Sequence, residues 1–447
     1  MRLSGHTPLA RTDKVSVHQK TLLSSLWVDS VEEFTAMMAA MEEADSSADP
    51  STLASLRKNA TALLEGIPEK ELAPWRRTAA GGALGCRIDP QNMATFRAHG
   101  RVSLPGSVAP QLSDAPLPPC VRLMDKLFPI RDQGQRGTCV AFASVALREY
   151  IDACSTELSE QFLYWACKQL DGLPDEAGTF VHTAMSALST KGVCSRHDWP
   201  YNPEPTPGDE AQSPPPDKRE RLEHLALAFV MPYTRSVAPN SVNHYKQILS
   251  GADGLGGMPI VISSLVFNSW FRSAATNQSG KITMPLPGEP PLSGGHAMSI
   301  VGYQDDPSVP GGGYFIVRNS WSAAWAARSP EAAGHAMMPY AYVEQYVVEA
   351  FSGQVMATTP DSDVGRQRQE VAAANEPLTF EERCARTLRQ DMRDVEGKLL
   401  QAGSRVICHP DSPEEVMEDT PANRARFKKL QFDWTDRTRR IPDITSK

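Results

Sequence analysis

The stretch RDQGQRGTCVAF, residues 131–142, joins a short glycine-containing loop directly to an apolar helix. Gly134 and Gly137 allow an unusual, tight backbone in that loop, and Cys139 follows in the first turn of a helix expected over residues 139–153. The unpaired N–H groups and the positive dipole end of a helix lower the pKa of a thiol placed there. Cys139 is therefore a candidate nucleophile, although an isolated cysteine at a helix start is more often an ordinary buried thiol.

Gln133, shortly before Cys139, carries a side-chain amide that can donate a hydrogen bond. Together with the backbone N–H of Cys139, this amide could hold the oxyanion of a tetrahedral intermediate. The alternative is that Gln133 is a simple turn residue.

Two further motifs supply the partners that a thiolate nucleophile needs. His296 follows a glycine pair, Gly294 and Gly295, that leaves room for an approaching backbone, and it opens an apolar strand. Histidine can both balance a thiolate and protonate a leaving amine near neutral pH. Asn319 follows the next strand, where its amide oxygen could orient the imidazole, or could merely cap the strand end. Trp321 could cover that hydrogen bond and exclude water.

Helix patterns precede strand patterns in the central region, which favours an α+β fold. Helices are expected at 139–153, 159–170 and 182–188, and strands at 259–265, 296–303 and 314–318. The proline-rich stretch 203–216 is interpreted as a surface insertion without core-forming potential.

The flanking regions have different compositions. Residues 1–103 predict an N-terminal helical domain, with a loose tail to about residue 20, a helix opened by the Ser30/Glu33 capping box and a second helix near 51–67. Residues 104–117 have the composition of a linker. Residues 353–447 predict a polar extension with one amphipathic helix at 378–402 and an extended or disordered tail over the last forty residues.

These motifs resemble those of the papain family of cysteine peptidases. DQGQRGTCVAFA resembles the family's QG-x-x-G-[ST]-C-x-AF signature, GGHAMSIVGY its histidine strand and NSWSAAW its asparagine motif. The resemblance covers about residues 118–352 and is closest to bacterial members. It implies a papain-like fold with a helical lobe, an antiparallel-sheet lobe and a peptide-binding cleft between them. It assigns Cys139, His296 and Asn319 as catalytic residues and Gln133 to the oxyanion hole, with Trp321 and Gly295 in support. It implies no cofactor.

Some positions depart from the family pattern. Secreted members pair a cysteine three residues before the nucleophile, where this chain has Arg136. That agrees with a reducing site of action. Val140 replaces the usual tryptophan and alters the floor of the cleft.

Composition and charge narrow the classes of partner. The net charge is −8, with no concentrated basic face, which argues against nucleic acid. No apolar run approaches the roughly 20 residues that span a bilayer, and the N-terminus lacks the apolar core of a secretory signal. We therefore expect a cytoplasmic protein that does not bind a membrane, with export as an effector as the alternative. The eight cysteines lack metal-ligand spacing, so no metal is assigned.

The sequence thus predicts a cysteine-type endopeptidase acting on peptide or protein substrates through a thioester acyl-enzyme. Two alternatives remain: a thiol acyl-transfer enzyme, such as a transpeptidase, deamidase or isopeptidase, and a catalytically silent binding module. Residues 1–117 are expected either to cover the cleft or to act in targeting or partner binding. The 378–402 helix is a second candidate surface for a protein partner.

Overall fold

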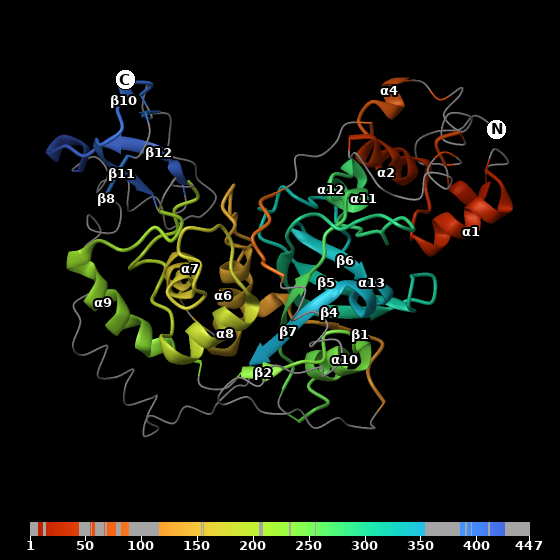
Figure 1. Ribbon diagram of the computed structural model, residues 1–447, viewed down its shortest axis with the longest axis horizontal. Helices are drawn as coiled ribbons and strands as arrows, with labels where there is room; N and C mark the ends of the chain where they lie inside the picture. The colour runs from red at the N-terminus through yellow and green to blue at the C-terminus, as the bar shows by residue number, and fades with distance from the viewer. Residues whose placement is uncertain are drawn as a thin grey trace.

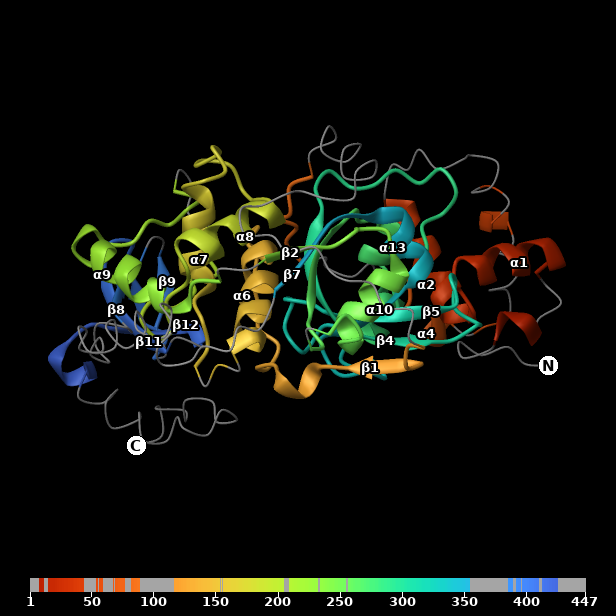
Figure 2. The ribbon, with the colours of Figure 1, turned by 90° about the horizontal axis from the view of Figure 1, so that it is seen from below.

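The computed structural model describes residues 8–11, 15–43, 54, 56–58, 67, 69–76, 82–88, 116–152, 154, 156–204, 209–231, 234–254, 256–353, 385–388, 391–394, 396–409 and 412–424. Figures 1 and 2 show a helical lobe, α6 to α9, beside a lobe built on an antiparallel sheet. The N-terminal helices lie on the far side of the sheet lobe, and a small C-terminal sheet lies by the helical lobe. Helices packed beside an antiparallel sheet confirm the α+β class.

The α-helices have these bounds: α1 Val17–Ser25, α2 Val31–Glu43, α4 Glu69–Leu72, α6 Cys139–Asp152, α7 Glu160–Lys168, α8 Val181–Thr190, α9 Pro216–Ala226, α10 Val242–Ser250, α11 Asn268–Phe271, α12 Ala274–Ser279 and α13 Tyr340–Tyr346. Three short 3-10 turns are η1 Leu9–Arg11, η2 Met124–Lys126 and η3 Leu227–Phe229.

The main sheet has seven strands in the order β2-β7-β3-β4-β5-β6, and β1 pairs with β4. All its pairings are antiparallel. Its strands are β1 Cys120–Arg122, β2 Thr234–Ser236, β3 Ile260–Ser264, β4 His296–Asp305, β5 Gly313–Arg318, β6 His335–Pro339 and β7 Val347–Gly353. The strands predicted at 259–265, 296–303 and 314–318 are thus confirmed.

Helix α6 is the core of the interface between the lobes. Its sequence, CVAFASVALREYID, is apolar on nearly every side, and all its residues except the last are buried. A helix that is apolar all round must be covered on every face, and α6 packs on β4, α7 and α8. This packing places the first turn of α6 against the first residues of β4, which is where the two lobes meet.

The N-terminal helices pack on the sheet lobe, as the placement of α2 beside α11 and α12 in Figure 1 shows. Lys281 Nζ contacts Asp29 Oδ2 at 2.8 Å and Glu33 Oε1 at 3.0 Å, and it lies over the Trp27 ring. The predicted capping box is confirmed, because Glu33 N–H donates to Ser30 Oγ at 3.2 Å. Helix α1, in contrast, begins inside the expected tail. Most of the helix expected near 51–67 and of the linker 104–117 lies outside the described residues.

The amphipathic helix predicted at 378–402 is wrong for the described residues. They form β8 Ala385–Thr387, β9 Met392–Arg393 and β10 Leu399–Leu400, which join β11 Arg405–His409 and β12 Ser412–Glu418 in two small sheets. A turn closed by Gly397, with φ of +82°, reverses the chain between β9 and β10. The apolar spacing that suggested a helix instead supplies a separate small core: Leu388, Leu400, Val406 and Val416, with Met392 against it.

Two neighbouring expectations also need correction. β12 and the residues after it to 424 lie within the stretch expected to be extended or disordered, whereas residues 425–447 lie outside the described part. The proline-rich insertion does contribute to the core, because Ala211 and Gln212 are buried. Prolines and glycines set the backbone path here without preventing the residues between them from packing.

Candidate active site

The Cys139 thiol lies at the interface of the two lobes. Cys139 is fully buried in the first turn of α6, and its Sγ accepts a hydrogen bond from the Ala297 N–H at 3.4 Å. Ala297 directly follows His296 in β4, so the thiol lies one residue from the histidine. The fold therefore brings together two residues that are distant in the chain.

His296 and Asn319 form the second contact of the site. His296 Nε2 and Asn319 Oδ1 are 2.8 Å apart, and the Ser320 N–H donates to the same oxygen at 2.8 Å. Because Oδ1 already accepts from Ser320, it acts as an acceptor and fixes the Nε2–H tautomer of the imidazole. His296 Nδ1 then has no hydrogen-bond partner in the described part of the chain and remains as the basic nitrogen.

The Trp321 indole stacks on the His296 ring, with centroids 4.4 Å apart and an interplanar angle of 24°. Trp325 meets Trp321 edge to face at 5.3 Å. Both indoles are buried, so the two rings cover the imidazole–amide contact from water.

Gln133 is held from both lobes. Its Nε2 donates to the Arg136 carbonyl at 2.9 Å, and its Oε1 accepts from Ser320 Oγ at 2.6 Å. The Gln133 N–H also donates to the Ser320 carbonyl at 2.9 Å. Ser320 thus links the amide of Gln133 to the residue after Asn319. Ser320 was not among the predicted site residues, although it is the middle residue of the NSW motif.

An extended segment, residues 82–88, crosses this site between α6 and the sheet and is drawn as an orange loop in Figure 1. The Ala83 carbonyl accepts the second hydrogen bond from Gln133 Nε2, at 3.1 Å. The Gly85 carbonyl accepts from the Thr179 N–H at 3.0 Å, and the Gly85 N–H hydrogen-bonds to the Cys139 thiol. We refer to residues 82–88 as the covering segment.

The covering segment pairs with both walls of the site. Cys86 and Gly295 exchange two backbone hydrogen bonds, of 3.1 and 2.8 Å, and the Arg87 N–H donates to the Thr179 carbonyl at 2.9 Å. The pairing of Cys86 is parallel with Thr179 and antiparallel with Gly295. The sequence placed this segment in the N-terminal domain, and its only signal was a run of glycines.

Burial decides the protonation of the site. It raises the pKa of Cys139 to about 11, although N–H groups from Ala297, Gly85, Val140 and Cys139 itself act in the opposite direction. Burial likewise lowers the pKa of His296 to about 4, opposed by the hydrogen bond to Asn319. The expected lowering of the thiol pKa is therefore wrong for the covered site, because desolvation exceeds the effect of the helix end. Both groups are neutral in this state near pH 7.

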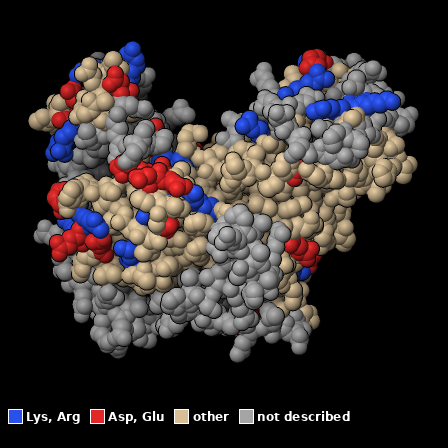
Figure 3. All heavy atoms as spheres, in the orientation of Figure 1, with Lys and Arg blue, Asp and Glu red and all other residues tan. Residues whose placement is uncertain are grey.

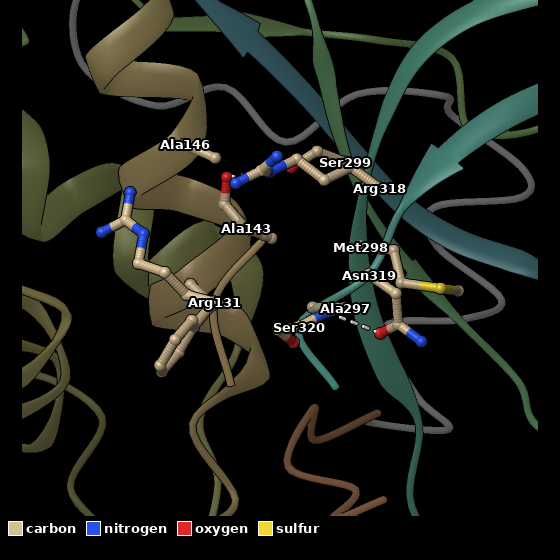
Figure 4. A pocket seen from close by; sticks show the side chains of 10 residues that line it. Arg131, Ala143, Ala146, Ala297, Met298, Ser299, Arg318, Asn319 and Ser320 are labelled. Carbon is tan, nitrogen blue, oxygen red and sulfur yellow. Dashed lines mark hydrogen bonds between the residues drawn. The ribbon is translucent and has the colours of Figure 1, made fainter. Parts of the chain in front are cut away.

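Buried charges lie beside the site, between α6 and the ends of β4 and β5. Arg131 pairs with Glu149 and with Glu160 Oε1, the latter at 2.5 Å. Burial raises the pKa of Glu149 to about 7. Figure 4 shows the small pocket next to this cluster, lined by Arg131 and Arg318 and closed by Asn319 on the sheet side. These ion pairs join the loop before Cys139 to α6 and α7.

Among the described residues, no group of three or more His, Cys, Asp or Glu side chains is arranged to hold a metal ion. No helix in the same part of the chain has the length and apolar character to cross a membrane. Figure 3 shows acidic side chains gathered over the helical lobe, with basic side chains between them.

The chain is similar in sequence to known cysteine proteases. Residues 121–329 match the sequence model of the papain family cysteine proteases. An uncharacterized peptidase C1-like protein of Acanthamoeba polyphaga mimivirus is 28% identical over 271 residues, which cover 57% of this chain and 77% of that protein. Cysteine proteinase 1 of Entamoeba histolytica is 28% identical over 211 residues, covering 46% of this chain and only 59% of the relative. Among solved structures, xylellain, a cysteine protease from Xylella fastidiosa, is 26% identical, with a TM-score of 0.48, covering 63% of this chain and 98% of xylellain.

Proposed function

We propose that residues 121–329, which match the papain family model, form a cysteine peptidase region that hydrolyses peptide bonds through Cys139, His296 and Asn319. The observation that carries the proposal is the set of contacts at the lobe interface. The His296 ring is aimed by the 2.8 Å contact with Asn319, and the thiol of Cys139 lies one residue away, on the Ala297 N–H.

The proposed reaction begins when the covering segment leaves the site. Water and substrate then reach the thiol, so the burial that holds both groups neutral is relieved and proton transfer from Cys139 to His296 Nδ1 becomes favourable. The thiolate attacks the scissile carbonyl carbon and forms a C–S bond. The oxygen that gains charge is held by the Cys139 N–H and by the Gln133 Nε2–H that now serves Ala83.

His296 completes both halves of the cycle in this proposal. Its protonated Nδ1 gives the proton to the leaving amine as the C–N bond breaks, which leaves a thioester on Cys139. The neutral imidazole next takes a proton from water, which attacks the thioester and releases the acid and the thiol. Asn319 keeps the ring oriented throughout, and Trp321 keeps water from its amide oxygen.

A peptide-library digest of the full chain beside Cys139→Ala tests this proposal. Cleaved peptides that gain the mass of one water, and that are absent from the Cys139→Ala digest, are the expected result. Products that join two peptides would instead indicate acyl transfer. A folded protein whose Cys139 fails to react with a peptide vinyl sulfone even when the covering segment is displaced would support the silent binding module.

We further propose that the covering segment keeps the full chain inactive until it moves. It occupies the Gln133 amide, the Cys139 thiol and the backbone of Gly295 at once, and a peptide substrate would need the same groups. Partner binding by the N-terminal helices or by the C-terminal sheets is the alternative role of these regions. If a bound partner released the covering segment, both roles would hold, because partner binding would then activate the chain.

A further inference from the structure

Arg136 lies three residues before Cys139, and its side chain is buried to 2% exposure. The guanidinium carbon is 5.3 Å from the centre of the Tyr164 ring and 5.2 Å from that of Tyr201. A guanidinium over aromatic faces is attracted to the ring quadrupoles, and the attraction is stronger where water is excluded. Arg136 therefore holds two tyrosines in place at the same time.

The hydrogen bonds of the guanidinium fix its orientation. Nη1 donates to Gln161 Oε1 at 2.8 Å and to the Asn202 carbonyl at 2.6 Å, and Nη2 donates to the Glu210 carbonyl at 3.3 Å. Within the described residues, no carboxylate forms an ion pair with Arg136. The positive charge is thus balanced by carbonyl dipoles and aromatic faces, which a shorter or non-planar side chain could not reach together.

The first tyrosine, Tyr201, holds the loop that precedes the nucleophile. Its hydroxyl donates to the Gln133 carbonyl at 2.8 Å and lies 2.6 Å from Thr138 Oγ1. The Arg136 carbonyl, in the same loop, accepts from Gln133 Nε2 and from the Thr138 N–H. The loop from Gln133 to Cys139 is therefore fastened at both ends through groups that Arg136 organises.

The second tyrosine, Tyr164, holds the opposite wall of the site. Its hydroxyl accepts from the Gly178 N–H at 3.0 Å and donates to Glu210 Oε1 at 2.9 Å. Gly178 precedes Thr179, whose backbone pairs with the covering segment. Tyr164 thereby fixes the backbone edge on which an extended peptide would align.

We propose that Arg136 is a positioning residue that sets both the oxyanion amide of Gln133, through Tyr201, and the peptide-aligning edge at Thr179, through Tyr164. The inference rests on the proposed function, because it concerns how that same site stabilises an oxyanion and binds an extended peptide.

A peptide aldehyde separates the two effects without requiring turnover. The Cys139 thiol adds reversibly across the aldehyde C=O, forming a C–S bond, and the oxygen that becomes the hemithioacetal hydroxyl lies where Gln133 can donate to it. Iodoacetamide alkylates the same thiol and does not use the oxyanion hole. In the full chain, Arg136→Met is expected to weaken aldehyde binding about 10- to 100-fold, while the alkylation rate stays within about twofold of wild type.

A double-mutant cycle tests whether Arg136 acts through Gln133. If it does, Arg136→Met added to Gln133→Ala should weaken binding of a minimal acetyl-amino aldehyde no further than Gln133→Ala alone. Arg219→Met is the matched control, because Arg219 also stacks on an aromatic ring, 5.1 Å from the centre of Trp165, but lies on the surface of α9. The control variant should bind the aldehyde as wild type does.

Two conservative variants test the proposal independently, in case Arg136→Met does not fold. Tyr201→Phe removes only the hydroxyl that holds Gln133 and should weaken the minimal aldehyde. Tyr164→Phe removes only the hydroxyl that accepts from Gly178 and donates to Glu210, and it should weaken an extended peptide aldehyde while sparing the minimal one.

The proposal is overturned if all these variants bind both aldehydes as wild type does. It is also overturned if Arg136→Met still weakens the minimal aldehyde in the Gln133→Ala background, or if aldehyde binding and alkylation fall together. A wild-type chain that is alkylated at Cys139 but forms no aldehyde adduct would point to failure of the proposed function itself, and the inference would fall with it.

Discussion

Gly85 gives the most direct way to open the site. A Cβ added to this residue would lie 2.1 Å from the carbonyl carbon and oxygen of Gly137, a distance that no real contact shows. The obstacle is backbone, in the loop that carries Gln133, so it cannot rotate away as a side chain would. Gly85 does not adopt a left-handed φ, so valine is excluded here by space alone. Gly85→Val should therefore displace the covering segment.

The size of the effect follows from the contacts that would be lost. The described contacts include four backbone hydrogen bonds to Thr179 and Gly295 and one from Gln133 Nε2. At about 1 kcal/mol each they favour closure by about 5 kcal/mol. Burial of the Cys86 side chain adds to this and ordering the segment costs most of the sum, so we take a net preference for closure of about 3 kcal/mol, or an open population on the order of 1 in 150. Gly85→Val is thus expected to raise kcat/KM of the full chain about 100-fold.

The assay is hydrolysis of a fluorogenic peptide by the full chain, run beside the alkylation rate of Cys139 with iodoacetamide. Leu84→Val is the control, because it changes the neighbouring side chain without adding an atom to the close approach at Gly137. The double variant Gly85→Val with Cys139→Ala supplies the blank. Equal hydrolysis and equal alkylation for wild type and Gly85→Val would refute the reasoning, since the thiol would then be as accessible with the segment in place.

Three further predictions use the same assay. Gln133→Ala in the Gly85→Val background should lower kcat about 10²- to 10³-fold, because one of two oxyanion donors is lost; an unchanged kcat would remove Gln133 from the site. Because burial raises the pKa of Cys139 to about 11, and only the thiolate reacts, alkylation of wild type should rise with pH toward that value. In Gly85→Val the rise should occur closer to neutrality, and identical profiles would contradict this. Lys281→Met removes the contact with Glu33 and should raise hydrolysis about two- to fivefold by loosening the N-terminal helices, an effect that added salt should reproduce in wild type.

The elements at the lobe interface were predictable because their patterns are local. An apolar run of the length of α6 and short apolar strands such as β4 and β5 have few ways to be buried. The same holds for the capping box at Ser30, whose hydrogen bonds span only three residues. In each case the residues that decide the structure are neighbours in the chain.

The wrong predictions concern features that are determined by residues distant in the chain. The spacing of Leu388, Met392 and Leu399 fits a helix equally well as a set of short strands, and the contacts with β11 and β12 select the strands. The pKa of Cys139 was expected to fall from the helix end alone. That reasoning lacked the burial of the thiol in the folded chain, to which the covering segment, more than fifty positions earlier, contributes contacts.

Motifs predicted the residues that meet in the candidate site, but they could not predict the state of the site, because the path of the covering segment depends on complementary backbone groups. That path also predicts that the segment is not a substrate. The carbonyl on Gln133 Nε2 belongs to Ala83, whereas the group at the Cys139 sulfur is the N–H of Gly85. Attack needs one carbonyl whose carbon faces the sulfur while its oxygen faces the amide. Since the two contacts fall on different peptide units, the segment occupies every group that a substrate would use while presenting no bond to be cut.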